Sequence, residues 1–171
     1  MGLATDLDYR HRSPNAFQRL IQGFASTRPG AWVFAKVLRH LDDAATRLSR
    51  GRLSTPEVLA GLPVLDLTTT GRKSGSPRAS HLISIPVGDD LAVIGSNFGQ
   101  PSTPAWVLNL ETEPRATVVY KHRTVAVVAR HASEEEARDV MERSRAIYGG
   151  YEKYVQRVSG RRVRIFVLEP A

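Results

Sequence analysis

The sequence predicts one domain that is mainly β with flanking helices, in which about six antiparallel strands form a closed or half-closed barrel. Short β-branched runs follow one another from residue 62 onward with tight turns between them, which is typical of an antiparallel meander. Closing such a meander into a barrel removes most exposed strand edges. The length of 171 residues, with 42% hydrophobic side chains, suits one domain with a real core.

Composition excludes several kinds of site. The chain has no cysteine, so disulfides, thiolate metal ligands and a cysteine nucleophile are ruled out. Its five histidines lack metal-ligand spacing, and we predict no metal site. No apolar run approaches the roughly 18 to 20 residues that cross a bilayer, and residues 1–12 lack the apolar run of a signal peptide. We therefore expect a cytoplasmic protein.

The net charge of +7 points to an acidic partner, and the excess of cations is greatest in residues 1–60. A basic surface can serve nucleic acid, anionic lipid or an acidic cofactor, and charge alone does not choose among them. The chain shows no helix-turn-helix signature, no zinc pattern and no aromatic-rich strand of the kind that binds RNA. We predict no nucleic-acid partner.

Residues 1–59 are expected to form a helical arm packed on the same domain as the barrel. Two amphipathic helices are predicted, the first opening at Ser13 and Pro14. The apolar stripes comprise Phe17, Leu20, Ile21 and Phe24, then Trp32, Phe34, Val37, Leu38, Leu41, Ala45 and Leu48. The alternative is that residues 13–50 contact the inner face of the cell membrane, or roof an apolar substrate pocket.

The remaining elements follow in chain order. The predicted strands cover residues 64–70, 78–86, 91–95, 115–120, 124–131 and 163–168. A helix opens after Thr103, and another opens with a capping box in which Ser133 is the N-cap and Glu136 the third helical residue. That second helix should end at Gly149 and Gly150, where glycine can adopt the left-handed cap. A short helix follows. Before the last strand, Arg161, Arg162 and Arg164 indicate a solvated turn, with contact to an anion as the alternative.

A basic loop follows the first strand and forms the first candidate site. Gly71 and Gly75 let the backbone adopt positive φ, and the cations come from Arg72, Lys73 and Arg78. Arginine offers planar bidentate donors and lysine a mobile charge, which together suit a phosphate or an acidic tail. The sequence predicts a phosphorylated small molecule as the ligand. The alternative is a hairpin turn whose charges only keep it solvated.

A second polar loop, residues 95–104, lies between the third strand and the next helix. If Thr103 is the N-cap and Pro104 the first helical residue, the N–H groups of Ala105 and Trp106 point out of the helix start toward a ligand. The alternative is a routine strand-to-helix connection.

These blocks in combination resemble the deazaflavin-dependent nitroreductase family, over roughly residues 60–171. The matching blocks are Leu-Thr-Thr-Thr-Gly-Arg-Lys-Ser-Gly at 67–75 with Pro77 and Arg78, Ser-Asn-Phe-Gly at 96–99 with Pro104, Ala105, Trp106, Asn109 and Leu110, and Val-Leu-Glu-Pro at 167–170. The resemblance implies a split β-barrel of the FMN-binding type. It also implies coenzyme F-420, an 8-hydroxy-5-deazaflavin with a phosphate and a polyglutamate tail, with FMN as the weaker alternative.

The resemblance also implies which residues hold the cofactor. By this resemblance, the phosphate and the tail would be bound by Arg72, Lys73 and Arg78 with the Ser74 hydroxyl. The rest of the cofactor would be contacted by Ser96, Asn97, Pro104, Ala105, Trp106 and Asn109. Some members of the family have a lysine where this chain has Asn97, so the phosphate would lose one cation. The resemblance further implies a homodimer, which the residues alone do not require.

The implied reaction is hydride transfer from the reduced deazaflavin to a small-molecule acceptor, namely a quinone, a nitroaromatic or an activated double bond. Tyr148 and Tyr151, with Tyr154, could line the acceptor pocket, and we predict Tyr148 and Tyr151 as catalytic residues that donate a proton or hydrogen bond. Clustered tyrosines can equally be core residues. The rival function is non-catalytic: a barrel that carries a cofactor or lipid, with a membrane-contacting N-terminal arm.

Overall fold

The computed structural model describes residues 2–9, 27, 62–148, 150–158 and 160–171. Both amphipathic helices predicted for the N-terminal arm lie outside the described residues, as does the membrane contact predicted for residues 13–50. No helix in the described part of the chain is long and apolar enough to span a bilayer.

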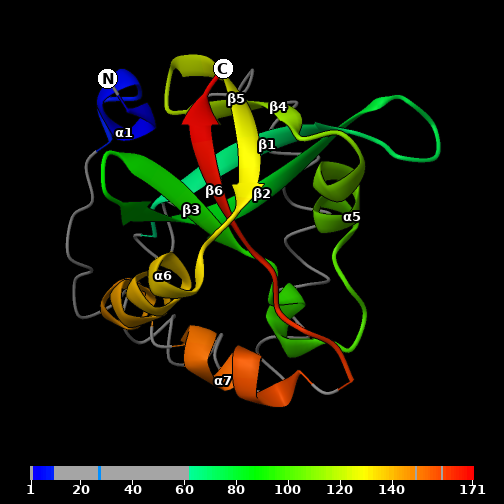
Figure 1. Ribbon diagram of the computed structural model, residues 1–171, viewed down its shortest axis with the longest axis vertical. Helices are drawn as coiled ribbons and strands as arrows, with labels where there is room; N and C mark the ends of the chain where they lie inside the picture. The colour runs from blue at the N-terminus through cyan, green and yellow to red at the C-terminus, as the bar shows by residue number, and fades with distance from the viewer. Residues whose placement is uncertain (1, 10–26, 28–61, 149, 159) are drawn as a thin grey trace.

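Six antiparallel strands close into a barrel in the order β1-β2-β3-β6-β5-β4 (Figure 1). The strands are β1 (Val64–Thr70), β2 (Pro77–Val87), β3 (Asp90–Ile94), β4 (Arg115–Tyr120), β5 (Arg123–His131) and β6 (Ile165–Pro170). Closure is made by β1, which pairs with β2 on one side and β4 on the other, so that Leu67 lies opposite both Ser80 and Val118. The predicted barrel is confirmed, and every predicted strand end lies within two residues of the observed one.

Two hydrophobic clusters share the central strand β3. Leu91 and Val93 face the barrel interior with Leu67 and Phe166, whereas Ala92 and Ile94 face a second cluster formed with the helices outside the barrel. Because successive residues of a strand point to opposite faces, a strand buried on both faces is apolar throughout rather than alternating. β3 therefore joins the barrel core to the helical layer.

The helices are α1 (Leu3–Asp6), α5 (Ala105–Thr112), α6 (Glu134–Ile147) and α7 (Gly150–Arg157), with the 3-10 turn η1 (Asn97–Gly99). In Figure 1, α5 lies beside the barrel near the β1–β2 hairpin, and α6 and α7 lie at the opposite end from α1. α6 packs on β2, and α7 contacts both α6 and η1. The two helices after β5 thus cover the side of the barrel that carries the second cluster, whereas α5 packs its buried side chains on the barrel cluster.

The start of α6 agrees with the prediction and its end does not. The Ser133 hydroxyl accepts from the Glu136 N–H at 3.2 Å, and the Glu136 carboxylate accepts from the Ser133 N–H at 2.8 Å, which confirms the capping box. α6 ends at Ile147, Tyr148 is extended at φ −153°, and Gly150 begins α7 rather than capping α6. The left-handed conformation predicted for Gly149 lies outside the described residues.

The short helix α1 has no counterpart in the sequence prediction. The Leu3 N–H donates to Asp90 Oδ1 at 2.9 Å and the Ala4 N–H to the Asp89 carbonyl at 2.9 Å, which ties α1 to the β2–β3 turn. Leu3 and Leu7 are buried in the barrel cluster. The spacing of these two leucines by four residues is the one signal that could have indicated the helix.

Candidate functional site

The predicted basic loop is the exposed tip of the β1–β2 hairpin, which extends past the rest of the barrel in Figure 1. Arg72, Lys73 and Arg78 are exposed, and within the described part of the chain none of them pairs with a carboxylate. Three cations without acidic partners keep their full charge for an external anion. The hairpin tip is therefore a basic surface.

Gly71 and Gly75 have different roles in this turn, contrary to the prediction that both adopt positive φ. Gly75 does so, at φ +65°. Gly71 does not, but a Cβ there would lie 2.8 Å from the Ser74 hydroxyl and 3.0 Å from the Ser76 carbonyl oxygen. The turn therefore needs Gly71 for close approach of the backbone. The Ser74 hydroxyl itself accepts from the Ser76 N–H at 3.3 Å, which leaves its own proton free to donate.

Asn109 joins the basic hairpin to α5. Its Oδ1 accepts from the Arg72 N–H at 3.0 Å, and its Nδ2 donates to Thr69 Oγ1 at 3.0 Å. The side chain is 4% exposed. The structure thus brings together the two stretches that the sequence singled out separately. Asn109, predicted as a cofactor ligand, directs both ends of its amide at the protein, so it positions the hairpin.

The start of α5 differs from the prediction by one residue. Pro104 is the N-cap, with ψ 143°, so neither Thr103 as N-cap nor Pro104 as the first helical residue is correct. The N–H groups of Ala105 and Trp106 nevertheless find no acceptor among the described residues. The Trp106 ring packs edge-on against Phe166 at 6.0 Å in the core, so only its backbone is directed toward the helix start.

The loop before α5 has an unusual backbone. Asn97, Phe98 and Gly99 follow one another at φ +48°, +54° and +79°. Asn97 Nδ2 donates within the loop, to the Ser102 carbonyl at 2.9 Å and its hydroxyl at 3.0 Å. Ser96 is buried, and its hydroxyl has no partner among the described side chains and backbone groups. Of the side chains of this loop predicted to bind the cofactor, the Ser96 hydroxyl and the Asn97 Oδ1 are the groups that make no hydrogen bond to the described residues, and Ser96 is the more buried of the two.

Arg161 holds this loop, a role that the sequence prediction missed. Its guanidinium donates to the carbonyl oxygens of Gly95 at 2.9 Å, Ser96 at 3.0 Å and Gln100 at 3.2 Å. Burial and the nearby Arg164 lower its pKa, and its buried Nε has no acceptor in the described structure. The predicted solvated turn is wrong for Arg161, and for Arg164, which pairs with Glu111 at 2.6 Å.

The tyrosines form one buried group beside this loop. The hydroxyls of Tyr148 and Tyr154 are hydrogen-bonded at 2.8 Å, and the Tyr148 ring lies 5.8 Å from that of Tyr151. Burial raises the pKa of Tyr148 and of Tyr151, so both keep their protons at neutral pH. Tyr154 also contacts Phe98 edge-on at 5.9 Å. Tyr154 therefore contacts the loop at residues 95–100, and the predicted catalytic residues Tyr148 and Tyr151 lie behind it in the same group.

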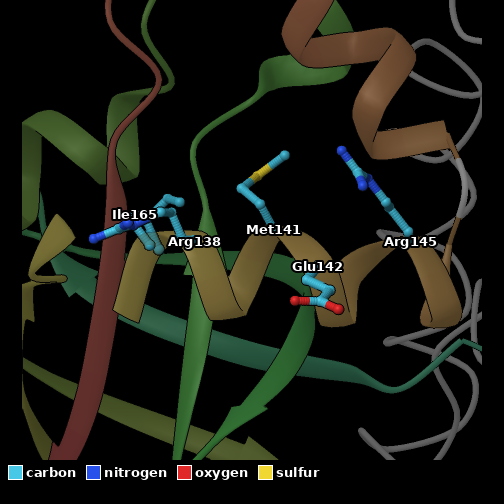
Figure 2. A pocket seen from close by; sticks show the side chains of 6 residues that line it. Arg138, Met141, Glu142, Arg145 and Ile165 are labelled. Atoms are coloured by element: carbon cyan, nitrogen blue, oxygen red, sulfur yellow. The ribbon is translucent and has the colours of Figure 1, made fainter. Parts of the chain in front are cut away.

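A separate hollow of about 450 Å³ lies along α6. Its lining comprises Ala137, Arg138, Met141, Glu142, Arg145 and Ile165. Figure 2 shows Arg138, Met141 and Arg145 rising from α6, with Ile165 of β6 nearby. None of the predicted site residues lines it. Within the described ranges, no three His, Asp or Glu side chains come together in a way that could hold a metal ion.

Fold and site together define a class: a small antiparallel barrel in which a basic hairpin, a helix start with free N–H groups and a group of protonated tyrosines lie on connected elements. This arrangement suits a ligand with an anionic end and a planar body. The family model for F420H(2)-dependent quinone reductase matches residues 39–170, and the chain belongs to this family.

The curated relatives carry the same description. The F420H(2)-dependent quinone reductase of Mycobacterium tuberculosis H37Rv is 31% identical over 93 residues, which cover 54% of this chain and 62% of that protein. The chain thus spans less than two thirds of the length of the curated relatives that it matches. A solved F420-H2 dependent reductase (FDR-A) is 27% identical with a TM-score of 0.57, over 63% of this chain and 94% of that one. A structure described as a domain-swapped dimer is 25% identical with a TM-score of 0.59, over 82% and 99%.

Proposed function

We propose that this protein is a reductase that uses coenzyme F-420 and passes a hydride from the reduced cofactor to a quinone. Membership of the quinone reductase family supports the reaction type. The observation that carries the proposal is the exposed set of Arg72, Lys73 and Arg78, none of which pairs with a carboxylate of the described residues, on a hairpin that Asn109 fixes beside α5.

The donors at this site fit the chemistry of the cofactor. Coenzyme F-420 has a phosphate and a chain of carboxylates, and the hairpin offers two guanidinium groups and one ammonium group to them. Uncharged donors come from the Ser74 and Ser96 hydroxyls and from the N–H groups of Ala105 and Trp106. Asn97 and Pro104 shape the loop that leads to these amides. FMN has a phosphate but no polyglutamate tail, so it would use fewer of these cations.

The bound reduced deazaflavin would supply a hydride, which together with one proton converts a quinone carbonyl pair to a hydroquinone in a two-electron reduction. The protein would contribute orientation and exclusion of water. Tyr148 and Tyr151 would supply a hydrogen bond or proton to the acceptor oxygen, and their raised pKa values keep that proton in place. A nitroaromatic or an activated double bond would be reduced at the same site, next to the same tyrosines.

Binding tests the hairpin. We expect Arg72→Ala with Lys73→Ala to weaken coenzyme F-420 binding at least tenfold at low salt, because each charged hydrogen bond contributes about 1.5 to 3 kcal/mol before solvent screening. The loss should shrink as salt is added. Fluorescence polarisation of the deazaflavin measures the affinity. Arg138→Ala with Arg143→Ala removes two charges from α6 and should leave it unchanged. Equal affinity in both double variants would remove the hairpin from the site.

Turnover separates an enzyme from a carrier. Menadione added to the protein with the reduced cofactor should restore the absorbance of the oxidised deazaflavin. Binding without oxidation would favour the carrier alternative, and tighter binding of FMN than of F-420 would contradict the cofactor.

A homodimer also stays a prediction, which a light-scattering mass of one chain would contradict. The membrane contact of residues 13–50 stays a prediction as well.

The tyrosine roles have a matched test, because Tyr148→Phe and Tyr154→Phe break the same hydrogen bond. If Tyr148 donates to the acceptor, Tyr148→Phe lowers kcat with menadione at least tenfold more than Tyr154→Phe does. Tyr151→Phe should also lower kcat. Since burial raises the pKa of Tyr148 above its ordinary value, kcat should show no tyrosine-dependent loss up to about pH 10. Equal kcat values for Tyr148→Phe and Tyr154→Phe would mean that the Tyr148–Tyr154 hydrogen bond has a structural role only.

A further inference from the structure

Phe98 is the exposed large hydrophobic side chain of the described structure, with 39% of its surface accessible. Its φ of +54° lies in the left-handed region, where a bulky side chain crowds its own backbone. Glycine would make the same turn without that strain. Strained residues of this kind persist only where the surroundings hold them, and they are concentrated at ligand sites.

Contacts on both sides of Phe98 hold it in this conformation. Arg161 donates to the carbonyl oxygens of Ser96 before it and Gln100 after it. Gly99 lies so close to α7 that a Cβ there would be 3.2 Å from the Tyr154 carbonyl oxygen and 3.1 Å from Arg157 Cβ. The loop is therefore pinned to α7 at its next residue, and the direction of the Phe98 side chain is set in advance.

The Phe98 ring is the outer end of a row of aromatic side chains. It meets Tyr154 at 5.9 Å with the planes 67° apart, and the Tyr154 hydroxyl bonds that of Tyr148 at 2.8 Å. Tyr151 lies behind Tyr148. On its other side, Phe98 follows Ser96 and Asn97, two of the residues predicted to bind the cofactor. Phe98 thus follows two predicted cofactor ligands in the chain and contacts Tyr154, which is hydrogen-bonded to the predicted catalytic residue Tyr148.

We propose that Phe98 is a specificity-determining residue whose ring contacts the acceptor and favours planar aromatic acceptors such as naphthoquinones. The inference rests on the proposed function and names the acceptor class for that site. A planar ring gains both buried apolar area and a favourable ring contact against an exposed aromatic edge or face. A small non-aromatic acceptor gains neither.

Binding without turnover tests the inference. The protein is saturated with oxidised coenzyme F-420, which cannot reduce a quinone, and menadione is titrated by calorimetry into the wild type and into Phe98→Ala, Phe98→Gly and Phe98→Tyr. We expect about three- to tenfold weaker menadione binding for the alanine and glycine variants and near wild-type binding for the tyrosine variant, which keeps the ring. Cofactor affinity, measured separately, should be the same in all four proteins.

Thermal unfolding provides a second measurement on the same variants. Both small variants lose the ring, but only glycine relieves the positive φ, so Phe98→Gly should melt about 2 to 4 °C above Phe98→Ala. That difference would show that the wild type keeps a strained ring that stability does not require.

Three results would overturn the inference. They are unchanged menadione affinity in the alanine and glycine variants, loss of cofactor affinity in step with menadione affinity, and no menadione binding to the wild-type complex. Failure of the proposed function looks different, because it appears as no binding of coenzyme F-420 to the wild type or no oxidation of the reduced cofactor by any acceptor.

Discussion

Asn109 shows how one buried amide connects two regions of the site. It accepts from the backbone of Arg72 on the hairpin and donates to the Thr69 hydroxyl on β1, while its own helix carries the free N–H groups of Ala105 and Trp106. A buried amide has to satisfy its hydrogen-bonding groups, and this requirement fixes where the hairpin lies relative to α5. The geometry of the basic surface thus depends on a residue that need not touch the ligand.

Removing this amide should be measurable in two ways. We expect Asn109→Ala to lower the free energy of unfolding by about 1 to 3 kcal/mol, because the buried Thr69 hydroxyl loses its donor, and to speed amide exchange at Arg72. Urea unfolding and hydrogen exchange measure the two effects. In a double-mutant cycle, Thr69→Val should couple to Asn109→Ala by at least 0.5 kcal/mol, yet leave exchange at Arg72 slow. Additive effects, with unchanged exchange at Arg72, would contradict the link.

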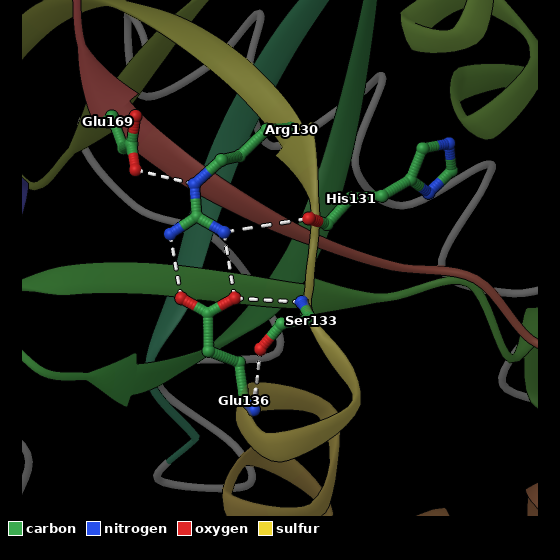
Figure 3. Close-up of polar contacts among 5 residues, drawn as sticks. All are labelled: Arg130, His131, Ser133, Glu136 and Glu169. Carbon is green, nitrogen blue, oxygen red and sulfur yellow. Dashed lines mark hydrogen bonds and ion pairs between the residues drawn. The ribbon is translucent and has the colours of Figure 1, made fainter.

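At the scale of elements, Arg130 joins β5, β6 and α6 (Figure 3). Its guanidinium binds both oxygens of Glu136 at 2.7 Å each and Glu169 Oε1 at 2.6 Å. Glu136 also completes the capping box with Ser133. The hydrogen bonds from Arg130 and from the Ser133 N–H lower the pKa of Glu136 to about 2. The Glu136 carboxylate therefore both fixes the connection from β5 to α6, through Arg130, and caps the N-terminus of α6, which packs over the second cluster.

This shift predicts the direction of a pH effect. Because the folded pKa of Glu136 lies below its ordinary value, the stabilisation is complete above about pH 4.5 and is lost as the pH falls toward about 2. Glu136→Gln can keep the capping box but not the ion pair. We expect it to be about 1 kcal/mol less stable than the wild type at pH 7, a modest value because the Glu136 side chain is 27% exposed.

Urea unfolding at pH 7, 4.5 and 3 measures the difference in the free energy of unfolding between the wild type and Glu136→Gln. This difference should become smaller as the pH falls from 4.5 to 3. Glu135→Gln is the matched control, since it removes the same charge from the same first turn of α6 while the contacts of Arg130 remain. A gap between wild type and Glu136→Gln that stayed constant down to pH 3 would mean that Glu136 is not held in its charged form.

At the scale of the whole molecule, the barrel positions the site by keeping the β1–β2 hairpin, α5 and η1 on a common frame. β1 closes the barrel against β4 and also contacts α5, so the basic hairpin extends from a strand that is held by two neighbouring strands and a helix. β3 carries the loop with Phe98 at its end and is buried on both faces. The proposed cofactor-binding and acceptor-binding surfaces would therefore start from strands that are paired on both sides.

Local patterns were sufficient for much of this structure. The β-branched runs predicted all six strands, and Ser133 with Glu136 predicted the start of α6, because side-chain alternation and capping depend on a few neighbouring residues. The order and spacing of the three sequence blocks, at residues 67–78, 96–110 and 167–170, indicated the family that the comparison confirmed. The part of the glycine cap predicted for Gly150 is wrong, because in the fold Gly150 belongs to the next helix, and Gly149 lies outside the described residues.

By itself, the sequence determined the strands, the capping box, the cations at Arg72, Lys73 and Arg78, and the family. The tertiary structure decided that Asn109 ties the hairpin to α5, that Arg161 holds the loop of Phe98, and that the Trp106 ring faces the core. The reason is physical: these contacts join residues 37 to 66 positions apart, and no local pattern encodes which buried donor will meet which distant carbonyl until the barrel has closed.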